Sequence, residues 1–277
     1  MIKHWFRNHP IAVFLVLTFG ITWSIAITAM LASDWFTAVF GGLNSKSPMF
    51  YLAVWSPNIA AFVVTLMVSG WPGITDLFAR LIRWRVRPWV WIAALGFFPV
   101  LMLVAELIGL ALGDPLPTTA NWTALAAGIV TLPLLALGPL GEELGWRGFL
   151  LPRLLDRVQP LTAALILGPV WMAWHLPAFF LSGMPQSNMS LFIFVASGVS
   201  LNVFITWLFL NARHSILIAG IIPHAIANAW AESMGSITWI NAGVLVGGAV
   251  LLVWLGGLRE VGAAKTPQKR LKKAPSP

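Results

Sequence analysis

The chain contains no cysteine, a single tyrosine and few charged residues. Without cysteine it has no disulfide framework, no thiol nucleophile and no thiolate metal site. Charged residues make up 9% of its 277 residues, whereas a soluble domain contains roughly 25%. Hydrophobic residues reach 58% and the mean hydropathy is +0.84, so this composition excludes an ordinary soluble domain.

Long apolar runs predict an all-α, polytopic membrane protein with about eight transmembrane helices. The first run is longer than the roughly 7–15 apolar residues of a signal-peptide core, so we expect it to be a retained span. The expected spans are residues 11–31, 50–70, 90–112, 122–140, 161–181, 191–210, 215–230 and 237–255.

The positive charges fall on one side of this arrangement. If the amino terminus is cytoplasmic, 16 of the 17 lysines and arginines lie in cytoplasmic segments, and Lys46 alone lies on the other side. The positive-inside rule therefore predicts a cell-membrane protein with both termini in the cytoplasm. The net charge of +8 is then explained by topology and by contacts with anionic lipids of the bilayer, and we expect no nucleic-acid partner.

Two adjacent carboxylates, Glu142 and Glu143, follow the fourth apolar run. On a helix, Glu143 and Arg147 are four residues apart and can pair on one face. Glu142 is rotated by about 100° from Glu143 and can point into a different cavity, unpaired by the arginine. In a low-dielectric site such a carboxylate can act as a general base. The alternative is that both acids simply mark the cytoplasmic end of the span.

Two other spans carry polar residues at helical spacing. His175 lies in an apolar run, and Trp171, one turn earlier, can wall its imidazole from lipid. His224 and Asn228 project from one face of the seventh span. Each histidine has a structural alternative, a hydrogen bond to a backbone carbonyl for His175 and contacts between helices for His224 with Asn228.

Together, a carboxylate, two imidazoles and a carboxamide can activate a water and hold a tetrahedral oxyanion. Intramembrane ionisable groups tend to face an interior cavity, which favours their meeting in one site. The chain contains neither Gly-x-Ser-x-Gly nor His-Glu-x-x-His, so serine-hydrolase and ordinary zincin chemistry are disfavoured.

These residues resemble the motifs of the CAAX prenyl endopeptidase and bacteriocin-processing family of intramembrane proteases (CPBP, or Abi). That family is marked by Glu-Glu-x-x-x-Arg, Phe-x-x-x-His and His-x-x-x-Asn on separate transmembrane helices. The first motif is intact at residues 142–147, the second has Trp171 in place of phenylalanine before His175, and the third runs from His224 to Asn228.

The resemblance implies an intramembrane endopeptidase acting on membrane-associated or lipidated peptides or on membrane proteins. The resemblance further implies that Glu142 is the base, that His175 positions or polarises the water, and that His224 and Asn228 stabilise the oxyanion. Glu143 and Arg147 form the supporting pair.

Metal dependence stays open at this stage. Members of the family are labelled metalloproteases, but a glutamate-dependent mechanism without metal has also been argued for them. If Zn²⁺ is present, the expected ligands are Glu142, His175 and His224. No ligand pair sits at a familiar zinc spacing, which favours the reading without an obligatory metal.

The resemblance also divides the chain. Residues 1–120 hold the first three spans and an amphipathic cytoplasmic segment at residues 76–88, which we expect at the headgroups. Residues 121–256 form the protease-like core, with its site nearer the cytoplasmic side, and residues 257–277 a basic tail expected to be disordered.

A non-catalytic alternative uses the same polar cavity only for binding, as a transporter or an immunity factor. The sequence favours the enzyme, because a scaffold has no need of all four site residues. Three further polar residues have no assigned role. Glu106 is an intramembrane acid, Asn202 is expected to join helices, and Asn58 follows Pro57 at an expected kink.

Overall fold

The computed structural model describes residues 6–44, 47–113, 137–234 and 237–258, and these residues form helices without any strand. The predicted all-α fold is confirmed. The helices are α2 (Pro10–Leu31), α3 (Ser33–Phe40), α4 (Pro48–Val54), α5 (Ser56–Leu81), α6 (Pro88–Ala111), α9 (Leu137–Glu143), α10 (Leu151–Leu155), α11 (Pro160–Trp174), α12 (Leu191–Asn211), α13 (Ile222–Met234) and α14 (Trp239–Trp254). Two π-helical turns, η1 (Leu144–Leu150) and η4 (Leu217–Ile221), and two 3₁₀ turns, η2 (Leu176–Phe180) and η3 (Pro185–Asn188), complete the described elements.

Five described helical segments are long and apolar enough to cross a membrane: Pro10–Leu31, Ser56–Leu81, Pro88–Ala111, Pro160–Phe180 and Leu191–Asn211. A shorter apolar helix, Trp239–Trp254, coincides with the expected last span. The expected fourth span, residues 122–140, lies outside the described residues except for its last four. The protein is therefore a multi-pass membrane protein.

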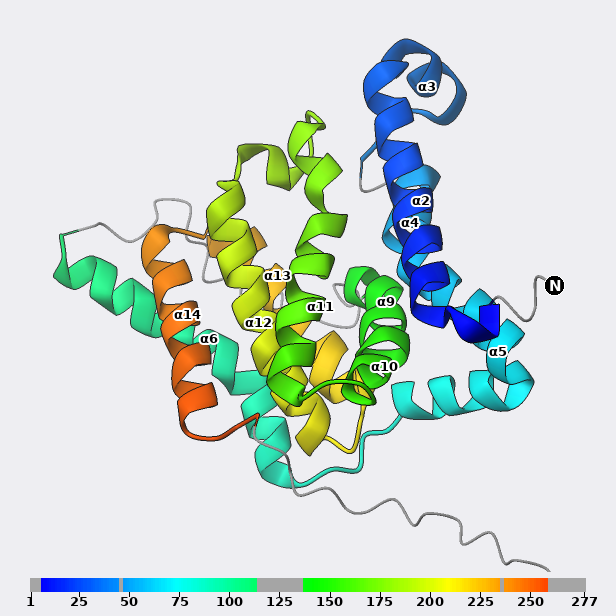
Figure 1. Cartoon of the computed structure of the whole chain (residues 1–277). Helices are drawn as coiled ribbons and strands as arrows, with labels where there is room; N and C mark the ends of the chain where they lie inside the picture. The colour runs from blue at the N-terminus through cyan, green and yellow to red at the C-terminus, as the bar shows by residue number, and fades with distance from the viewer. Residues whose placement is uncertain (1–5, 45–46, 114–136, 235–236, 259–277) are drawn as a thin grey trace, which may run out of the picture.

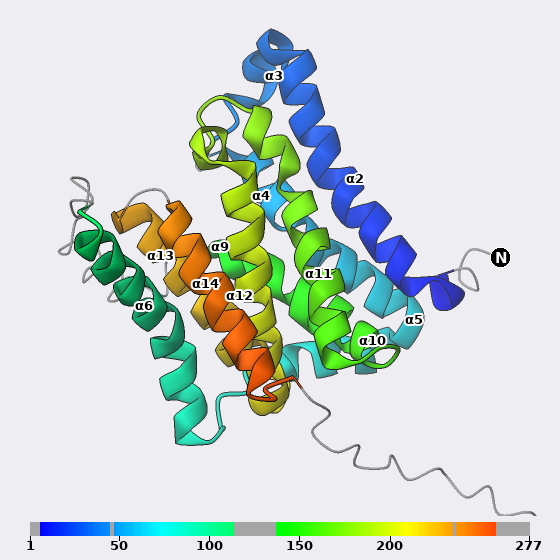
Figure 2. The same cartoon turned by 60° about the vertical axis from the view of Figure 1, so that its left-hand side comes forward.

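The helices form a layered bundle. In both views α6, α14, α12 and α11 stand next to one another in that order, and α2 and α5 lie beyond α11 on the other side (Figures 1 and 2). The short helices α9 and α10 stand between α11 and α5 (Figure 1). One large apolar cluster joins these layers, and it includes the stacked pairs Phe14–Phe149 and Phe97–Phe204.

The expected second span is interrupted near its start. Instead of one helix over residues 50–70, α4 ends at Val54 and α5 begins at Ser56. Pro57 explains the break, because it has no N–H to bond to the carbonyl of Ala53, one turn earlier. The hydroxyl of Thr22 in α2 donates to that carbonyl at 2.9 Å instead. The break is therefore stabilised by a contact between helices.

Helix α5 also bends at Gly70, whose φ of 65° and ψ of −162° are non-helical. Beyond the bend, its last part runs across the bundle at a steep angle to the first (Figure 1). Only the first half of the amphipathic segment at residues 76–88 is helical, because α5 ends at Leu81. Residues 82–87 are not helical, and the hydroxyl of Ser215 holds this stretch by donating to the carbonyl of Arg83 at 2.5 Å.

Candidate active site

The two adjacent acids lie at the end of α9, but not at the end of the helical stretch. The chain continues through η1 and α10 to Leu155. Glu142 and Glu143 are therefore inside the bundle, and both are buried. Burial of both side chains and the twelve helical residues after Glu143 do not favour the alternative in which the acids simply mark the end of a span.

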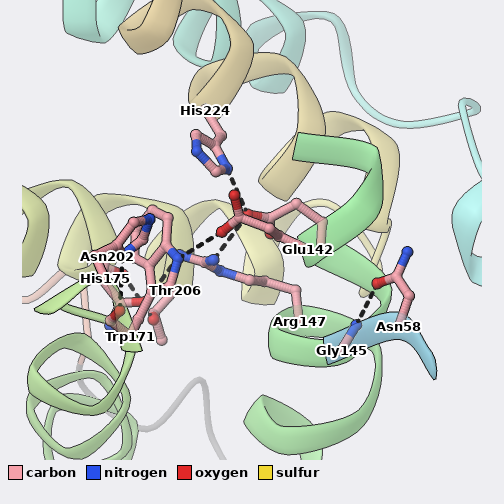
Figure 3. Close-up of polar contacts among 10 residues, drawn as sticks. Asn58, Glu142, Gly145, Arg147, Trp171, His175, Asn202, Thr206 and His224 are labelled. Carbon is pink, nitrogen blue, oxygen red and sulfur yellow. Dashed lines mark hydrogen bonds and ion pairs between the residues drawn. The ribbon is translucent and has the colours of Figure 1, made fainter. Parts of the chain in front are cut away.

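Asn58 of α5 holds the junction between α9 and η1. Its amide nitrogen donates to the carbonyl of Leu140 at 2.6 Å. Its Oδ1 accepts from the backbone N–H of Gly145 at 3.1 Å (Figure 3). A change from α-helical to π-helical bonding leaves backbone groups without their usual partners, and buried backbone groups must be paired. The Asn58 side chain therefore stabilises the turn that carries the acids.

Three glycines let this turn approach α5 and its neighbours closely. A Cβ atom at Gly141 would lie 2.7 Å from Trp55, one at Gly145 would lie 2.4 Å from Pro57, and one at Gly148 would lie 2.5 Å from Leu77. Real Cβ atoms do not make such contacts, so any larger residue would displace the turn. The absence of side chains at these three glycines therefore allows the close packing that places the acids inside the bundle.

Glu143 is the centre of a buried polar network. Its Oε1 accepts from Arg147 Nη1 at 2.8 Å and from His224 Nδ1 at 2.9 Å. Arg147 Nη2 in turn donates to Asn202 Oδ1 at 3.0 Å, and the Asn202 amide donates to the carbonyl of Ala164 at 2.7 Å (Figure 3). This confirms the predicted Glu143–Arg147 pair and adds two partners, one from α12 and one from α13.

Glycine also makes room for Glu143 on the side of η4. A Cβ atom at Gly220 would lie 2.4 Å from Glu143 Oε2. That oxygen is buried and has no hydrogen-bond partner among the described residues. Because η4 leads directly into α13, its close approach brings His224 within reach of the carboxylate.

Glu142 has a different partner. The indole N–H of Trp171 donates to Glu142 Oε2 at 2.8 Å (Figure 3). The same indole ring lies under the guanidinium of Arg147, whose central carbon is 4.3 Å from the ring centre. Trp171 thus contacts the surroundings of both acids in different ways. Its N–H donates to Glu142, and its ring stacks on Arg147, the cation that neutralises Glu143. The prediction that Glu142 is unpaired by the arginine agrees with this geometry.

His175 is held at the end of α11. Its Nδ1 lies 2.9 Å from the carbonyl oxygen of Trp171. A carbonyl can only accept, so Nδ1 carries the hydrogen and the neutral ring leaves Nε2 free to accept. The rings of Trp174 and Phe194 contact the imidazole edge to face, with centroids 4.7 Å and 5.3 Å away. The backbone bond is the structural alternative named above, and it also fixes the tautomer.

The predicted site residues converge on one cavity of about 390 Å³. Five of them line it: Glu142, Trp171, His175, His224 and Asn228. Asn228 lies one turn after His224 on α13 and is exposed, whereas the acids and His224 are buried. Glu143 and Arg147 do not line the cavity and lie behind it. The remaining walls are mostly apolar, from α2, α4, α11, α12 and the connection between α11 and α12.

The expected metal ligands do not assemble into a metal site. Within the described part of the chain, no three His, Cys, Asp or Glu side chains lie close enough together to hold a metal ion. Glu142 Oε2 is occupied by Trp171, and His224 Nδ1 by Glu143. These bonds leave Glu142 Oε1 and Nε2 of both histidines, which are suitable zinc donors, but the three side chains are not gathered around one point in this conformation.

The three unassigned polar residues have structural partners. Glu106 Oε1 accepts from Asn241 of α14 at 3.1 Å, away from the cavity. Asn202 joins α12 to α11 as expected, by donating to the carbonyl of Ala164, and its bond from Arg147 also makes it part of the network behind the site. Asn58 supports the turn of the acids, which the expected kink did not indicate. The role of Asn202 was indicated in the sequence by a carboxamide side chain inside an apolar span.

Comparison with known proteins agrees with these motifs. The family model described as "Type II CAAX prenyl endopeptidase Rce1-like" matches residues 124–230. A curated relative, "CAAX prenyl protease 2" of Methanococcus maripaludis, is 27% identical over 213 residues, which is 70% of this chain and 77% of that protein. The matched segment contains both acids, both histidines and Asn228.

Proposed function

This chain belongs to the CAAX prenyl endopeptidase (CPBP) family of membrane proteases, and from that premise we propose an intramembrane endopeptidase in which Glu142 activates the attacking water. The substrates are membrane-associated or lipidated peptides, or membrane proteins, whose scissile bond reaches the cavity. The protein lies in the cell membrane with both termini in the cytoplasm. The segment 121–256, which contains the residues 124–230 matched by the family model, is the proposed catalytic part.

The observation that carries the mechanism is the division of the two acids. Glu143 is neutralised by Arg147 and bonded to His224. Glu142 faces the cavity, and Trp171 bonds only one of its oxygens. Glu142 Oε1 is therefore the oxygen available to a water, and Trp171 fixes the orientation of the carboxylate.

A water that lies between Glu142 Oε1 and His175 Nε2 can donate one hydrogen bond to each of these two atoms. As its oxygen bonds to the carbonyl carbon of the substrate, its proton passes to Glu142 and the carbonyl oxygen becomes an oxyanion. When the C–N bond breaks, Glu142 gives that proton to the departing amine nitrogen. The products are a carboxylic acid and an amine, and the enzyme returns to its starting state.

His224 and Asn228 then face the oxyanion. The Asn228 carboxamide supplies N–H donors directly. His224 Nδ1 donates to Glu143, so His224 can also donate from Nε2 only when both of its nitrogens carry a proton. Donors aimed at the developing charge lower the barrier.

The test compares wild-type protein in detergent with Glu142→Gln, using quenched-fluorescence peptides derived from membrane segments. Glutamine keeps the acceptor for Trp171 but cannot take a proton, so we expect a loss of roughly 10²–10⁴-fold in kcat. Glu106→Gln is the matched control, because Glu106 is an intramembrane acid outside the cavity. Equal cleavage by wild type and Glu142→Gln would sink the assignment and favour the non-catalytic alternative.

A further inference from the structure

Helix α13 presents one stripe of side chains to the cavity. The lining residues from this helix are His224, Ala227, Asn228, Ala231 and Glu232. Their positions follow the i, i+3, i+4, i+7, i+8 spacing of a single helical face. The stripe that carries two of the site residues therefore continues for one more turn, to a carboxylate that has no role in the proposed reaction.

Glu232 gives the cavity wall an unbalanced negative charge. It is one of two acids among the lining residues, and the other is Glu142. Glu232 is exposed, whereas Glu142 is buried. Within the described part of the chain no lysine or arginine lines the cavity, and its other walls are mostly apolar. The cavity thus contains an accessible carboxylate and no basic side chain of its own to pair with it.

The Glu232 carboxylate also has no partner elsewhere among the described residues. No hydrogen bond or ion pair joins it to another side chain or backbone group there. By contrast, Glu106 accepts from Asn241 and Glu142 accepts from Trp171. A carboxylate in apolar surroundings is stabilised by a partner, so Glu232 is suited to bind a group that enters the cavity.

The position of Glu232 within α13 offers no structural reason for an acid. It lies in the last turn of the helix, which ends at Met234 and has no basic residue in that turn. The free carbonyls make the carboxyl end of a helix negative, so a cation is favoured there and a carboxylate is not. A neutral residue at this position should therefore leave the helix at least as stable.

From these observations we infer that Glu232 is a specificity-determining residue that binds a basic side chain of the substrate. The inference rests on the proposed function, because it takes the cavity to be the place where the substrate binds. An otherwise apolar cavity with one accessible carboxylate favours an apolar peptide that carries one positive charge. It also disfavours a peptide with an acid at the same place, because the two like charges would repel each other.

The distance along α13 predicts where that basic residue lies in the substrate. Asn228 precedes Glu232 by four residues and His224 precedes it by eight, which correspond to rises of about 6 Å and about 12 Å. An extended peptide covers these distances in roughly two and roughly four residues. Ala227 and Ala231 have no side chain beyond Cβ, so they leave room for a peptide along this stripe. With the scissile carbonyl at His224 and Asn228, the basic residue lies roughly two to four residues from the cleaved bond.

The probes are twelve-residue peptides of leucine and alanine, acetylated and amidated at their ends, in which one lysine, norleucine or glutamate is moved along the chain. Norleucine has the carbon chain of lysine without its amine, so this pair isolates the charge. Binding is measured on Glu142→Gln protein in detergent, so the result does not depend on cleavage. The same ratio of Kd values on Glu142→Gln with Glu232→Gln corrects for partition of the peptides into micelles. Glu106→Gln is the matched control, because it removes an acid outside the cavity.

We expect lysine at one or two adjacent positions to lower the Kd about tenfold against norleucine. Glu232→Gln should remove this preference, Glu232→Lys should reverse it toward glutamate, and Glu106→Gln should keep it. Because Glu232 is exposed, its variants should unfold at the same SDS concentration as the background, so that a lost preference is not a lost fold. On protein that keeps Glu142, Glu232→Gln should raise KM for the lysine peptide and leave kcat within about twofold.

Equal binding of the three peptides at every position would refute the role of Glu232, and so would a lysine preference that survives Glu232→Lys. A fall in kcat at unchanged KM would also overturn it, because Glu232 would then act in the reaction and not in binding. If lysine is preferred but wild-type protein cleaves none of the peptides, the inference about Glu232 stands and the proposed function fails. Cleavage of all three peptides at equal rates at every position would leave the proposed function standing and refute the inference.

Discussion

The buried pair of Glu143 and Arg147 allows a test of how the site is held together. Both side chains have an exposed fraction of 0%, and their charged atoms are 2.8 Å apart. Replacing Arg147 with methionine keeps an apolar chain in place but leaves the Glu143 carboxylate buried without its cation. It also removes the donor to Asn202 and the cation over the Trp171 ring.

Removing one partner of a buried ion pair costs about 3–5 kcal/mol. Since proteins are stable by only about 5–15 kcal/mol, we expect Arg147→Met to lose a large part of the stability. In the double variant Glu143→Gln with Arg147→Met, no charge is left uncompensated. We therefore expect most of the loss to be recovered, with a coupling free energy of at least about 2 kcal/mol in the double-mutant cycle.

The assay is unfolding of purified protein by SDS titration in mixed micelles, followed by the fluorescence of the 16 tryptophans. Proteolysis is measured on the same samples. The recovered double variant should still be inactive, because His224 then faces an amide in place of a carboxylate. If Arg147→Met changes the free energy of unfolding by less than about 1 kcal/mol, or if the double variant is as unstable as the sum of the singles, the network does not work as described.

Three further substitutions test other contacts. Trp171→Phe removes the donor to Glu142 and should lower kcat about tenfold with little change in KM; an unchanged kcat would contradict its role in orienting the base. Gly145→Ala places a Cβ 2.4 Å from Pro57 of α5 and should lower the free energy of unfolding of the protein by about 1–3 kcal/mol. The control Gly243→Ala, whose Cβ has nothing within 4 Å, should not lower it. Equal stability of the two variants in the same SDS titration would contradict the close approach of η1 to α5. Glu106→Gln keeps its acceptor for the helix α14 and should leave cleavage rates within about twofold, and a larger loss would mean that Glu106 reaches the reaction.

Several parts of this site follow from spacing along single helices. The pairing of Glu143 with Arg147 and the common face of His224 and Asn228 each depend only on a separation of four residues. The division between Glu142 and Glu143 depends on the rotation between adjacent helical residues. These predictions needed no knowledge of which helices are neighbours, and the structure places the side chains as expected.

Contacts between distant segments could not be predicted in this way. The bond from Trp171 to Glu142 spans 29 residues, the bond from His224 to Glu143 spans 81, and the bond from Gly145 to Asn58 spans 87. A helical pattern fixes which face a residue occupies, but not which helix packs against that face. The position of the π turn η1 has the same origin, because the side chain of Asn58 in a separate helix bonds to its backbone.

The adjacent acids acquire different chemistry because their neighbours come from different helices. α13 and the turn η1 together hold Glu143 between a histidine and an arginine, so its charge is used to position those two groups. α11 supplies a neutral donor to Glu142, so its charge is oriented but not cancelled. A single carboxylate could not do both, because the cation that would hold it in a buried site would also weaken it as a base. Two adjacent acids on one helical turn therefore provide a fixed charge beside a reactive one, and the glycines of that turn bring both within reach of the other helices.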